Sequence, residues 1–514
     1  MPAMLQKSKE WVRRGIIFTW QLRFLRLVVV LALLAAAKHA FGLGKRWRET
    51  GRPPWPLGLG PAHRRPAPLA NPQRTFLVVS SDDWGRWTDA IPLFPDLDFV
   101  KQHPELQVAP TDFWYRLASV ETREDLQTLE NTLNELNAGA DYERRVVLTP
   151  HWIVAGPDFE AMRALSRPMR ARCAPSLPAN GGECSYRELL ISESAGGLAH
   201  APYHRGDLRA EYQRLFHQEL WHPEFHGRSH FAVNRWLEEL NVPNSAAAAC
   251  FNYSLVCSAD PMTTRSEFDW FTEHQDLRAW LVGGVRAFQH FWGYRPRVIS
   301  SPHNTWTPWL ADAAAAAGFV AASIGDDQRL YRMDGGMSLD QRLRFDAFFP
   351  GFDCSASIDS VVERLNRTRY VTVMWHAQNA MRSTYSEPQY REHYQCLRRL
   401  IAAVRERSQA LTLVTGSEMH QLRARGWSVE VWRDSLVYRN YSPRTLAVKV
   451  QDLAEFIAAP SWNDSDIRVE TLAPKAAHGE EAVRVRVGET LRVESDTVVR
   501  LRAPASEPER ATLA

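Results

Sequence analysis

The stretch around which this chain is organised reads Glu224-Phe225-His226-Gly227-Arg228-Ser229-His230-Phe231. Residues 232–240, directly after it, have the apolar spacing of a helix. Histidines four residues apart share one face of a helix, so the spacing predicts that His226 and His230 present two imidazoles to one metal ion. A chain with 17 histidines in 514 residues also produces such a pair roughly once by chance. Coincidence is therefore the alternative interpretation unless a third ligand can be named.

A second stretch, far upstream, supplies carboxylates. It reads Phe76-Leu77-Val78-Val79-Ser80-Ser81-Asp82-Asp83-Trp84-Gly85. An apolar run of this kind predicts a buried parallel strand that delivers Asp82 and Asp83 at its C-terminal end, where α/β sheets and barrels keep their sites. Adjacent strand residues point to opposite sides, so one acid can bind a metal while the other handles protons. The alternative is a polar turn after the strand.

From residue 71 onward, short apolar strands alternate with helical patterns, which is typical of an α/β layer or barrel. The expected strands cover residues 145–149, 297–301, 320–324 and 370–375, and the expected helices cover residues 266–292 and 307–318. His376 directly follows the last of these strands. His151 follows the strand at 145–149 and either lines the same cleft or makes a local hydrogen bond in a loop. Residues 156–220 are expected to be an insertion that shapes access to the site.

Taken together, these motifs resemble the polysaccharide deacetylase family of metal-dependent carbohydrate esterases. The resemblance rests on the strand that ends in Asp82 and Asp83, on the histidine motif from 226 to 230, and on His376 after a late strand. It spans about residues 71–423 and implies an α/β fold, a distorted (β/α) barrel.

The resemblance also implies roles for individual residues. Asp83, His226 and His230 would bind one divalent metal ion, with zinc as the expected ion. Two neutral imidazoles and one carboxylate leave such a cation partly charged, so it can lower the pKa of bound water and polarise an acyl oxygen. Asp82 would act as general base and His376 as general acid. Substrate contacts are expected from Trp84, His303 and Trp375.

The third family motif departs from its usual form here. The family usually carries an arginine that positions the catalytic carboxylate, followed by proline, an aromatic residue and glycine. In this chain the arginine position falls on Ser300, and His303 and Asn304 replace the aromatic residue and the glycine. Arg297 or His303 could substitute as the support of Asp82.

The N-terminal region predicts export. Basic residues precede an apolar run over residues 27–37, which is shorter than the roughly 20 residues of a spanning helix and within the length of a signal-peptide core. Residues 1–48 are therefore interpreted as a signal peptide or, if residues 16–20 extend the apolar segment, as an uncleaved membrane anchor. Residues 49–70 are a Pro-rich linker. The rest of the chain is expected in the periplasm, outside the cell or tethered to the membrane.

The cysteine count bears on the cellular compartment, and the net charge bears on the binding partners. The six cysteines are compatible with an exported protein and allow three local bridges, pairing Cys173 with Cys184, Cys250 with Cys257, and Cys354 with Cys396. The net charge of +3 is nearly neutral for this length, and no basic block argues for nucleic acid.

Residues 424–514 change in character to short, alternating strands with turns between them, at 429–432, 436–438, 447–450, 483–487 and 497–501. This pattern predicts a C-terminal all-β, sandwich-like module that binds glycan or caps the catalytic domain.

The resulting hypothesis is an exported, metal-dependent deacetylase of a polysaccharide or other glycan. Two alternatives come from other classes of protein. Two histidines and a carboxylate also form the facial triad of non-haem iron oxygenases, although those sites usually sit on all-β scaffolds. A glycan-binding protein with weak or no catalysis on the same fold is the second alternative.

Overall fold

The computed structural model describes most of the chain from residue 74 onward. The described residues are 74–85, 121–165, 169, 184–198, 204–256, 258, 260, 263, 267–268, 271, 273–302, 306–324, 337–347, 351–381, 387–408, 410–432, 435–449, 467–473, 483–485 and 490–502. The predicted export segment, the Pro-rich linker and His303 lie outside them. Within these ranges, no helix combines the length and apolar character that crossing a membrane requires.

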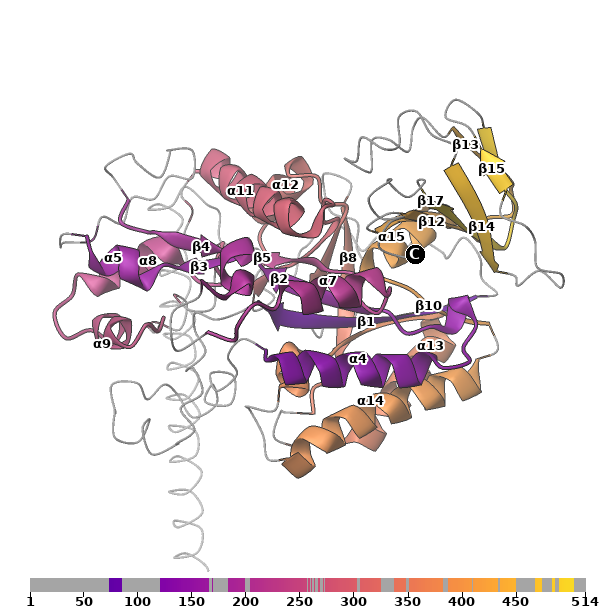
Figure 1. Cartoon of the computed structure of the whole chain (residues 1–514), viewed down its shortest axis with the longest axis horizontal. Coiled ribbons are helices and arrows are strands. Elements are labelled where there is room, and N and C mark those ends of the chain that lie inside the picture. The colour runs from indigo at the N-terminus through magenta and orange to yellow at the C-terminus, as the bar shows by residue number, and fades with distance from the viewer. Residues whose placement is uncertain are drawn as a thin grey trace, which may run out of the picture. The chain divides into compact units, whose positions relative to one another are not determined.

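Seven parallel strands form the barrel. In order of pairing they are β1 (Thr75–Trp84), β2 (Leu148–Ile153), β5 (Glu224–Gly227), β6 (Val298–Ser300), β7 (Ala321–Ile324), β8 (Ser338–Arg344) and β9 (Tyr370–Met374). β9 then pairs with β1, which closes the ring, and β10 (Leu411–Leu413) pairs in parallel with the first residues of β1. Figure 1 shows helices around this sheet, so the predicted α/β barrel is confirmed.

Helices connect and cover the strands. Their bounds are α4 (Arg123–Asn137), α5 (Phe159–Arg163), α7 (Arg209–His217), α8 (Val233–Leu240), α9 (Ala246–Asn252), α11 (His274–Trp292), α12 (Pro308–Ala316), α13 (Cys354–Thr368), α14 (Glu387–Arg407) and α15 (Gly416–Arg425). Local sequence signals explain where several of these helices begin or end. Thr122 and Asp125 form a capping box at the start of α4, and Gly293 ends α11 in a left-handed conformation. Thr307 caps α12, whose first residue is Pro308.

The predicted insertion contributes a small two-stranded antiparallel sheet of β3 (Ala155–Pro157) and β4 (Glu188–Leu190), in addition to α7. Cys354, at the start of α13, forms a disulfide with Cys396 in α14, which confirms one predicted bridge. Cys184 and Cys250 are also disulfide-bonded. Cys173 and Cys257, their predicted partners, lie outside the described residues.

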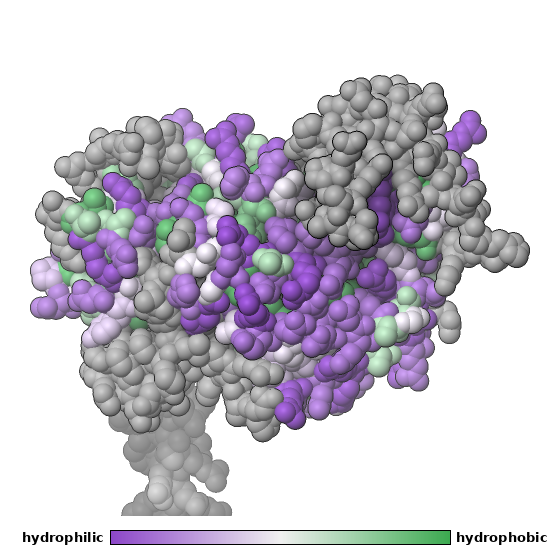
Figure 2. Space-filling view, viewed as in Figure 1, coloured by the Kyte–Doolittle hydropathy of each residue, from purple (hydrophilic) through white to green (hydrophobic). Residues whose placement is uncertain are grey.

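The core follows from the apolar strands. Residues Phe76, Leu77 and Val79 of β1 are at most 2% exposed, as expected for a strand covered on both faces. Tryptophans extend this core: the rings of Trp84 and Trp221 meet edge to face with centroids 5.3 Å apart. On the face shown in Figure 2, hydrophilic residues cover most of the described surface. Full burial of a Val, Leu, Ile, Phe or Met side chain stabilises a fold by about 1.5–3 kcal/mol relative to exposure.

The sequence pattern misses three strands of this sheet, β5, β8 and β10, and a fourth, β2, begins later than expected. β8 is missed because five of its seven residues, Ser-Leu-Asp-Gln-Arg-Leu-Arg, are polar. β10 is missed because it has only three residues. β2 begins at Leu148 rather than at residue 145 and runs through His151, so His151 is a strand residue and not a loop residue.

The C-terminal part is all β, as predicted. A five-stranded antiparallel sheet has the order β11 (Trp427–Trp432), β12 (Ser435–Asn440), β17 (Thr497–Arg502), β14 (Ile467–Ala473) and β15 (Val483–Val485). β13 (Leu446–Lys449) pairs with β16 (Thr490–Val493). The sequence pattern does not predict β14 and β16.

These strands are joined to the barrel through buried polar groups. His222 Nε2 lies 3.0 Å from the Val431 carbonyl oxygen, and Arg439 Nε donates to Glu418 at 2.6 Å. Accordingly, residues Arg65–Ala514 form one compact unit. The C-terminal strands therefore pack against the barrel domain through these contacts.

Candidate metal centre and active site

A bulge at the end of β1 separates its two acids. Ser81 is paired with Pro150 and Trp84 with Trp152, so β1 carries one more residue than β2 over this interval. Asp83 takes a left-handed backbone conformation with φ of 70°. Bulges re-aim side chains and are common next to active sites. Asp82 and Asp83 therefore have different partners, as the sequence predicts, although the bulge rather than simple strand alternation separates them.

A second bulge positions His226. Trp152 is paired with Phe225 and Ile153 with Gly227, which leaves His226 as the extra residue on β5. The predicted helical geometry of the histidine pair is wrong, because His226 lies on this strand and the helix α8 begins only at Val233. His230 lies in the intervening loop with φ of 66°. Parallel pairing in the barrel overrides the helical spacing, and the loop brings the two rings to 5.3 Å.

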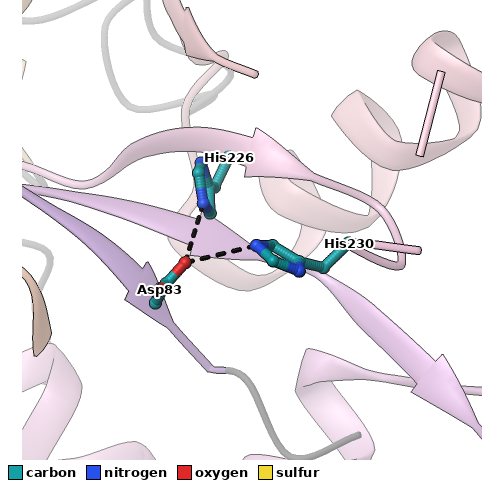
Figure 3. A group of neighbouring side chains, drawn as sticks. All are labelled: Asp83, His226 and His230. Atoms are coloured by element: carbon teal, nitrogen blue, oxygen red, sulfur yellow. Dashed lines mark hydrogen bonds and ion pairs between the residues drawn. The ribbon is translucent and has the colours of Figure 1, made fainter. Parts of the chain in front are cut away.

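Asp83, His226 and His230 converge as the metal hypothesis requires (Figure 3). Asp83 Oδ1 lies 3.0 Å from His226 Nε2 and 3.3 Å from His230 Nε2. One ligand atom from each residue lies within 4.8 Å of the other two, and all three side chains are buried. No other group of His, Cys, Asp or Glu in the described ranges has this geometry.

The hydrogen bonding of His226 tests whether this group fits a cation. His226 Nδ1 lies 2.9 Å from the Ser300 carbonyl oxygen, which can only accept, so Nδ1 carries the proton. Nε2 then directs a lone pair at the Asp83 carboxylate, which is unfavourable unless a cation or a second proton lies between them. Two imidazole nitrogens and one carboxylate oxygen are a donor set typical of catalytic zinc sites, so the residues fit a divalent metal.

Gln378 fixes the other oxygen of Asp83. Its Nε2 donates to Asp83 Oδ2 at 3.0 Å, and the side chain is buried. Gln378 lies in the short 3-10 helix Ala377–Ala380, directly after β9. The contact leaves Asp83 Oδ1 directed at the two histidines.

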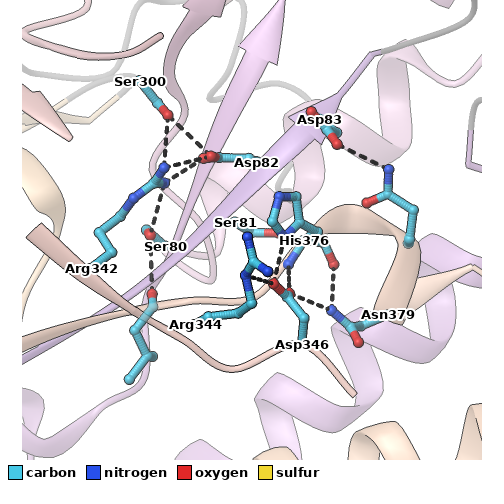
Figure 4. Close-up of polar contacts among 12 residues, drawn as sticks. Ser80, Ser81, Asp82, Asp83, Ser300, Arg342, Arg344, Asp346, His376 and Asn379 are labelled. Carbon is cyan, nitrogen blue, oxygen red and sulfur yellow. Dashed lines mark hydrogen bonds and ion pairs between the residues drawn. The ribbon is translucent and has the colours of Figure 1, made fainter. Parts of the chain in front are cut away.

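Asp82 is held by an arginine from a strand that the sequence pattern does not predict (Figure 4). Arg342 on β8 donates from Nη1 to Oδ1 and from Nη2 to Oδ2, both at 2.6 Å. Ser300 Oγ donates to Asp82 Oδ2 at 3.1 Å and accepts from Arg342 Nη2 at 3.0 Å. Burial alone would raise the pKa of Asp82, but the Arg342 guanidinium outweighs it and holds that pKa well below its usual range.

Arg342 therefore takes the place expected of Arg297 or His303. The Arg297 guanidinium donates instead to the Val429 carbonyl oxygen at 3.1 Å, toward the C-terminal strands. His303 lies outside the described residues. The departure at Ser300 thus leaves Asp82 with an arginine partner, supplied by another strand.

His376 follows β9 and contacts a buried carboxylate that follows β8. Its Nδ1 donates to Asp346 Oδ2 at 2.8 Å, and its backbone N–H donates to Asp346 Oδ1 at 2.7 Å. Asn379 Nδ2 donates to the same carboxylate at 3.1 Å. Burial alone would lower the pKa of His376, but the Asp346 carboxylate outweighs it and raises that pKa above its usual value. Figure 4 shows these contacts.

The remaining candidate site residues are more deeply buried than the sequence suggests. Trp84 and Trp375, predicted as substrate contacts, are completely buried. Trp84 Nε1 donates to Ser81 Oγ at 2.8 Å, and the Trp375 ring packs against Tyr394. His151 is buried on β2, and burial lowers its pKa to about 3, so its imidazole is neutral.

Sequence reasoning misses Arg342, Asp346 and Gln378. Asp346 repeats the arrangement of an acid at the end of a strand, but this signal depends on recognising β8, which ends at Arg344. Gln378 lies two residues after His376, but no sequence motif marks an amide at this position as a contact of Asp83. Arg342 could be found only by first recognising β8.

Comparison with known proteins gives structural neighbours alone. No family model matches the sequence, and no curated protein matches it. A solved structure from Mycobacterium smegmatis, named as a polysaccharide deacetylase, is 15% identical over 71% of this chain and 96% of that one, with a TM-score of 0.35. Agd3, named as a novel carbohydrate deacetylase, is 14% identical over 84% of this chain and 65% of that one, with a TM-score of 0.36. A 4-alpha-glucanotransferase from Thermococcus litoralis is 10% identical over 68% of this chain and 40% of that one, also at 0.36.

These neighbours are distant in both sequence and superposition. Function is therefore inferred from residues of this chain, namely the paired acids of β1, the two histidines and the His376–Asp346 contact. In these motif residues and in its α/β barrel the chain resembles the polysaccharide deacetylases.

Proposed function

We propose that this protein is a metal-dependent hydrolase that removes acyl groups, and acetyl groups in particular, from a polysaccharide or cell-envelope glycan. One observation carries the proposal: the ligand atoms of Asp83, His226 and His230 converge within 4.8 Å at the C-terminal end of parallel barrel strands. That is the end at which barrel enzymes keep their active sites. Asp82 and His376, with opposite electrostatic environments, flank this group.

A divalent cation held by the three residues would supply Lewis acidity toward the acyl oxygen and would lower the pKa of water. Asp82 then accepts the proton of the attacking water. Its low pKa keeps it ionised, and a carboxylate has about four lone-pair positions, so the contacts with Arg342 and Ser300 leave acceptor capacity. Arg342 also fixes the plane of the carboxylate, which holds the base in one orientation.

His376 donates a proton to the leaving nitrogen or oxygen. Because Nδ1 donates to Asp346, Nε2 is the ring nitrogen that would donate this proton. The raised pKa of His376 keeps the imidazolium populated near neutral pH, as a general acid requires. Paired groups whose pKa values are pushed apart are typical of sites that use one base and one acid.

The proposal is tested with zinc-loaded protein and a panel of N-acetylated and O-acetylated glycans. Release of acetate from at least one of them is expected. Glycan binding without acetate release would favour the glycan-binding alternative. Turnover that requires iron and oxygen would favour the oxygenase alternative.

We further propose that residues 71–514 function outside the cytoplasm, with the N-terminal segment as signal or membrane anchor. The Cys354–Cys396 disulfide supports this, because structural disulfides persist mainly in oxidising compartments. A reporter that is active only in the cytoplasm, fused after Ala514, should stay silent. Strong reporter activity would contradict export.

A further inference from the structure

The loop that carries His230 is wrapped around one buried carboxylate. Glu267, which is completely buried, accepts the backbone N–H of Arg228 at Oε1 over 2.7 Å and the backbone N–H of His230 at Oε2 over 2.8 Å. The backbone N–H of Ser229 also interacts with this carboxylate. The indole Nε1 of Trp280 on α11 donates to Oε1 at 2.8 Å. Three consecutive peptide N–H groups that point at one anion form a backbone nest.

Gly227 makes room for this carboxylate. A Cβ atom built on Gly227 would lie 2.2 Å from Glu267 Oε2, far inside contact distance. The Gly227 φ of 156° is also one that side-chain-bearing residues rarely adopt. Glycine at this position therefore lets the carboxylate approach the backbone between the two histidines.

Different carboxylates hold the Arg228 side chain and the backbone of this loop. The Arg228 guanidinium pairs with Glu188 on β4 and lies over the Trp280 ring, 4.5 Å from its centroid. Glu188 therefore fixes the side chain of Arg228, whereas Glu267 fixes the peptide groups that lead to His230.

We propose that Glu267 is the positioning residue that sets His230 for metal binding. This inference rests on the proposed metal site and deepens it. The left-handed conformation of His230, φ 66°, is uncommon for a residue other than glycine and needs compensation from its surroundings. The hydrogen bond from its own N–H to Glu267 supplies that compensation and directs the imidazole at Asp83, 3.3 Å away.

A carboxylate suits this role better than an amide. The partners of Glu267 named above are all N–H donors, and a carboxylate offers only acceptors. A glutamine would direct its own NH₂ group at one of these donors.

The test measures zinc affinity of the metal-free full chain by competition with a chromophoric chelator. Glu267→Gln should weaken zinc binding by about 10- to 100-fold, the usual cost of losing an outer partner of a metal ligand. Gly227→Ala, which drives a methyl group into the carboxylate, should act in the same direction. In a Glu267→Ala background, Gly227→Ala should cost much less, because the clash is gone and the two effects are coupled.

Two further measurements separate positioning from general destabilisation. Glu188→Gln, the matched control, should retain the zinc affinity of the wild type. The cobalt-loaded Glu267→Gln protein should show an altered visible absorption spectrum while its circular dichroism stays native, because His230 is displaced and the fold is kept. If Glu267→Gln does not fold, Gly227→Ala and its spectrum carry the test.

Unchanged zinc affinity and an unchanged cobalt spectrum in either variant would overturn the role of Glu267. Additive effects of the two substitutions would overturn the coupling. A wild-type chain that binds no zinc or cobalt would instead contradict the proposed function itself, so the two failures are distinguishable.

Discussion

Arg342 on β8 binds both carboxylate oxygens of Asp82 on β1, at 2.6 Å each, across 260 residues of sequence. Ser300 occupies the position at which the resembled family usually has its arginine, and its hydroxyl bridges the same two groups. The cation that orients Asp82 thus comes from another strand of the barrel. A sequence comparison limited to the third motif would conclude that this support is lost.

Replacement of Arg342 should therefore damage both stability and turnover. Arg342→Met leaves the Asp82 charge buried without its partner, which typically costs about 3–5 kcal/mol of unfolding free energy. Denaturant unfolding and kcat measure the two effects. The exchange Arg342→Ser with Ser300→Arg is the matched control, and it should recover part of both losses. Wild-type turnover in Arg342→Met would show that the pair is not needed.

The two adjacent acids should behave differently. Asp83→Asn removes the anionic ligand, so zinc affinity and activity should fall together. Asp82→Asn keeps shape and hydrogen bonding but cannot accept the proton, so zinc should be retained while kcat falls by about 10²- to 10⁴-fold. Zinc titration and acetate release on each variant separate the two. Unchanged turnover in Asp82→Asn would refute its role as base.

The pH dependence of activity should report His376. The general acid must be protonated, so kcat/KM is expected to fall as pH rises through the pKa of His376, which Asp346 raises. Asp346→Asn removes that influence and leaves burial, which lowers the pKa. The alkaline limb of the profile should therefore move to lower pH. A limb that stays in place in Asp346→Asn would assign it to another group.

Gln378 should matter for metal binding although it is not a ligand. Gln378→Leu removes the donor that fixes Asp83 Oδ2, so Oδ1 loses its preferred orientation toward the histidines. Zinc affinity should fall by about 10- to 100-fold. Asn379→Leu is the comparison variant, because Asn379 contacts Asp346 and not Asp83. It should change zinc affinity less. Equal effects in the two variants would argue against orientation of Asp83 by Gln378.

Much of the barrel could be predicted because its strands are buried on both faces. The apolar runs that contain Phe76 to Val79 and Tyr370 to Met374 are recognisable without any partner, and the groups at their ends, Asp82, Asp83 and His376, follow directly. Helix α12 was equally accessible, because Thr307 and Pro308 are a local start signal.

What could not be predicted depends on contacts between distant parts of the chain. The spacing of His226 and His230 suggests a helix, and only the pairing of β5 with β2 shows a strand with a bulge. Arg342 is buried against Asp82 but lies on a largely polar strand. Glu267 lies in the region predicted as helix 266–292, whereas α11 begins only at His274, so the helical pattern gives no indication of its contact with the histidine loop. Such residues become visible only once the tertiary structure is known.

Asp83, His226 and His230 are proposed to hold a metal ion on which deacetylation depends. The most direct measurement is acetate release by the wild type after removal of metal with a chelator, followed by titration with zinc. Activity should disappear and return at about one equivalent of zinc per chain, and it should not return in His230→Ala. Full acetate release by metal-free protein would contradict the claim.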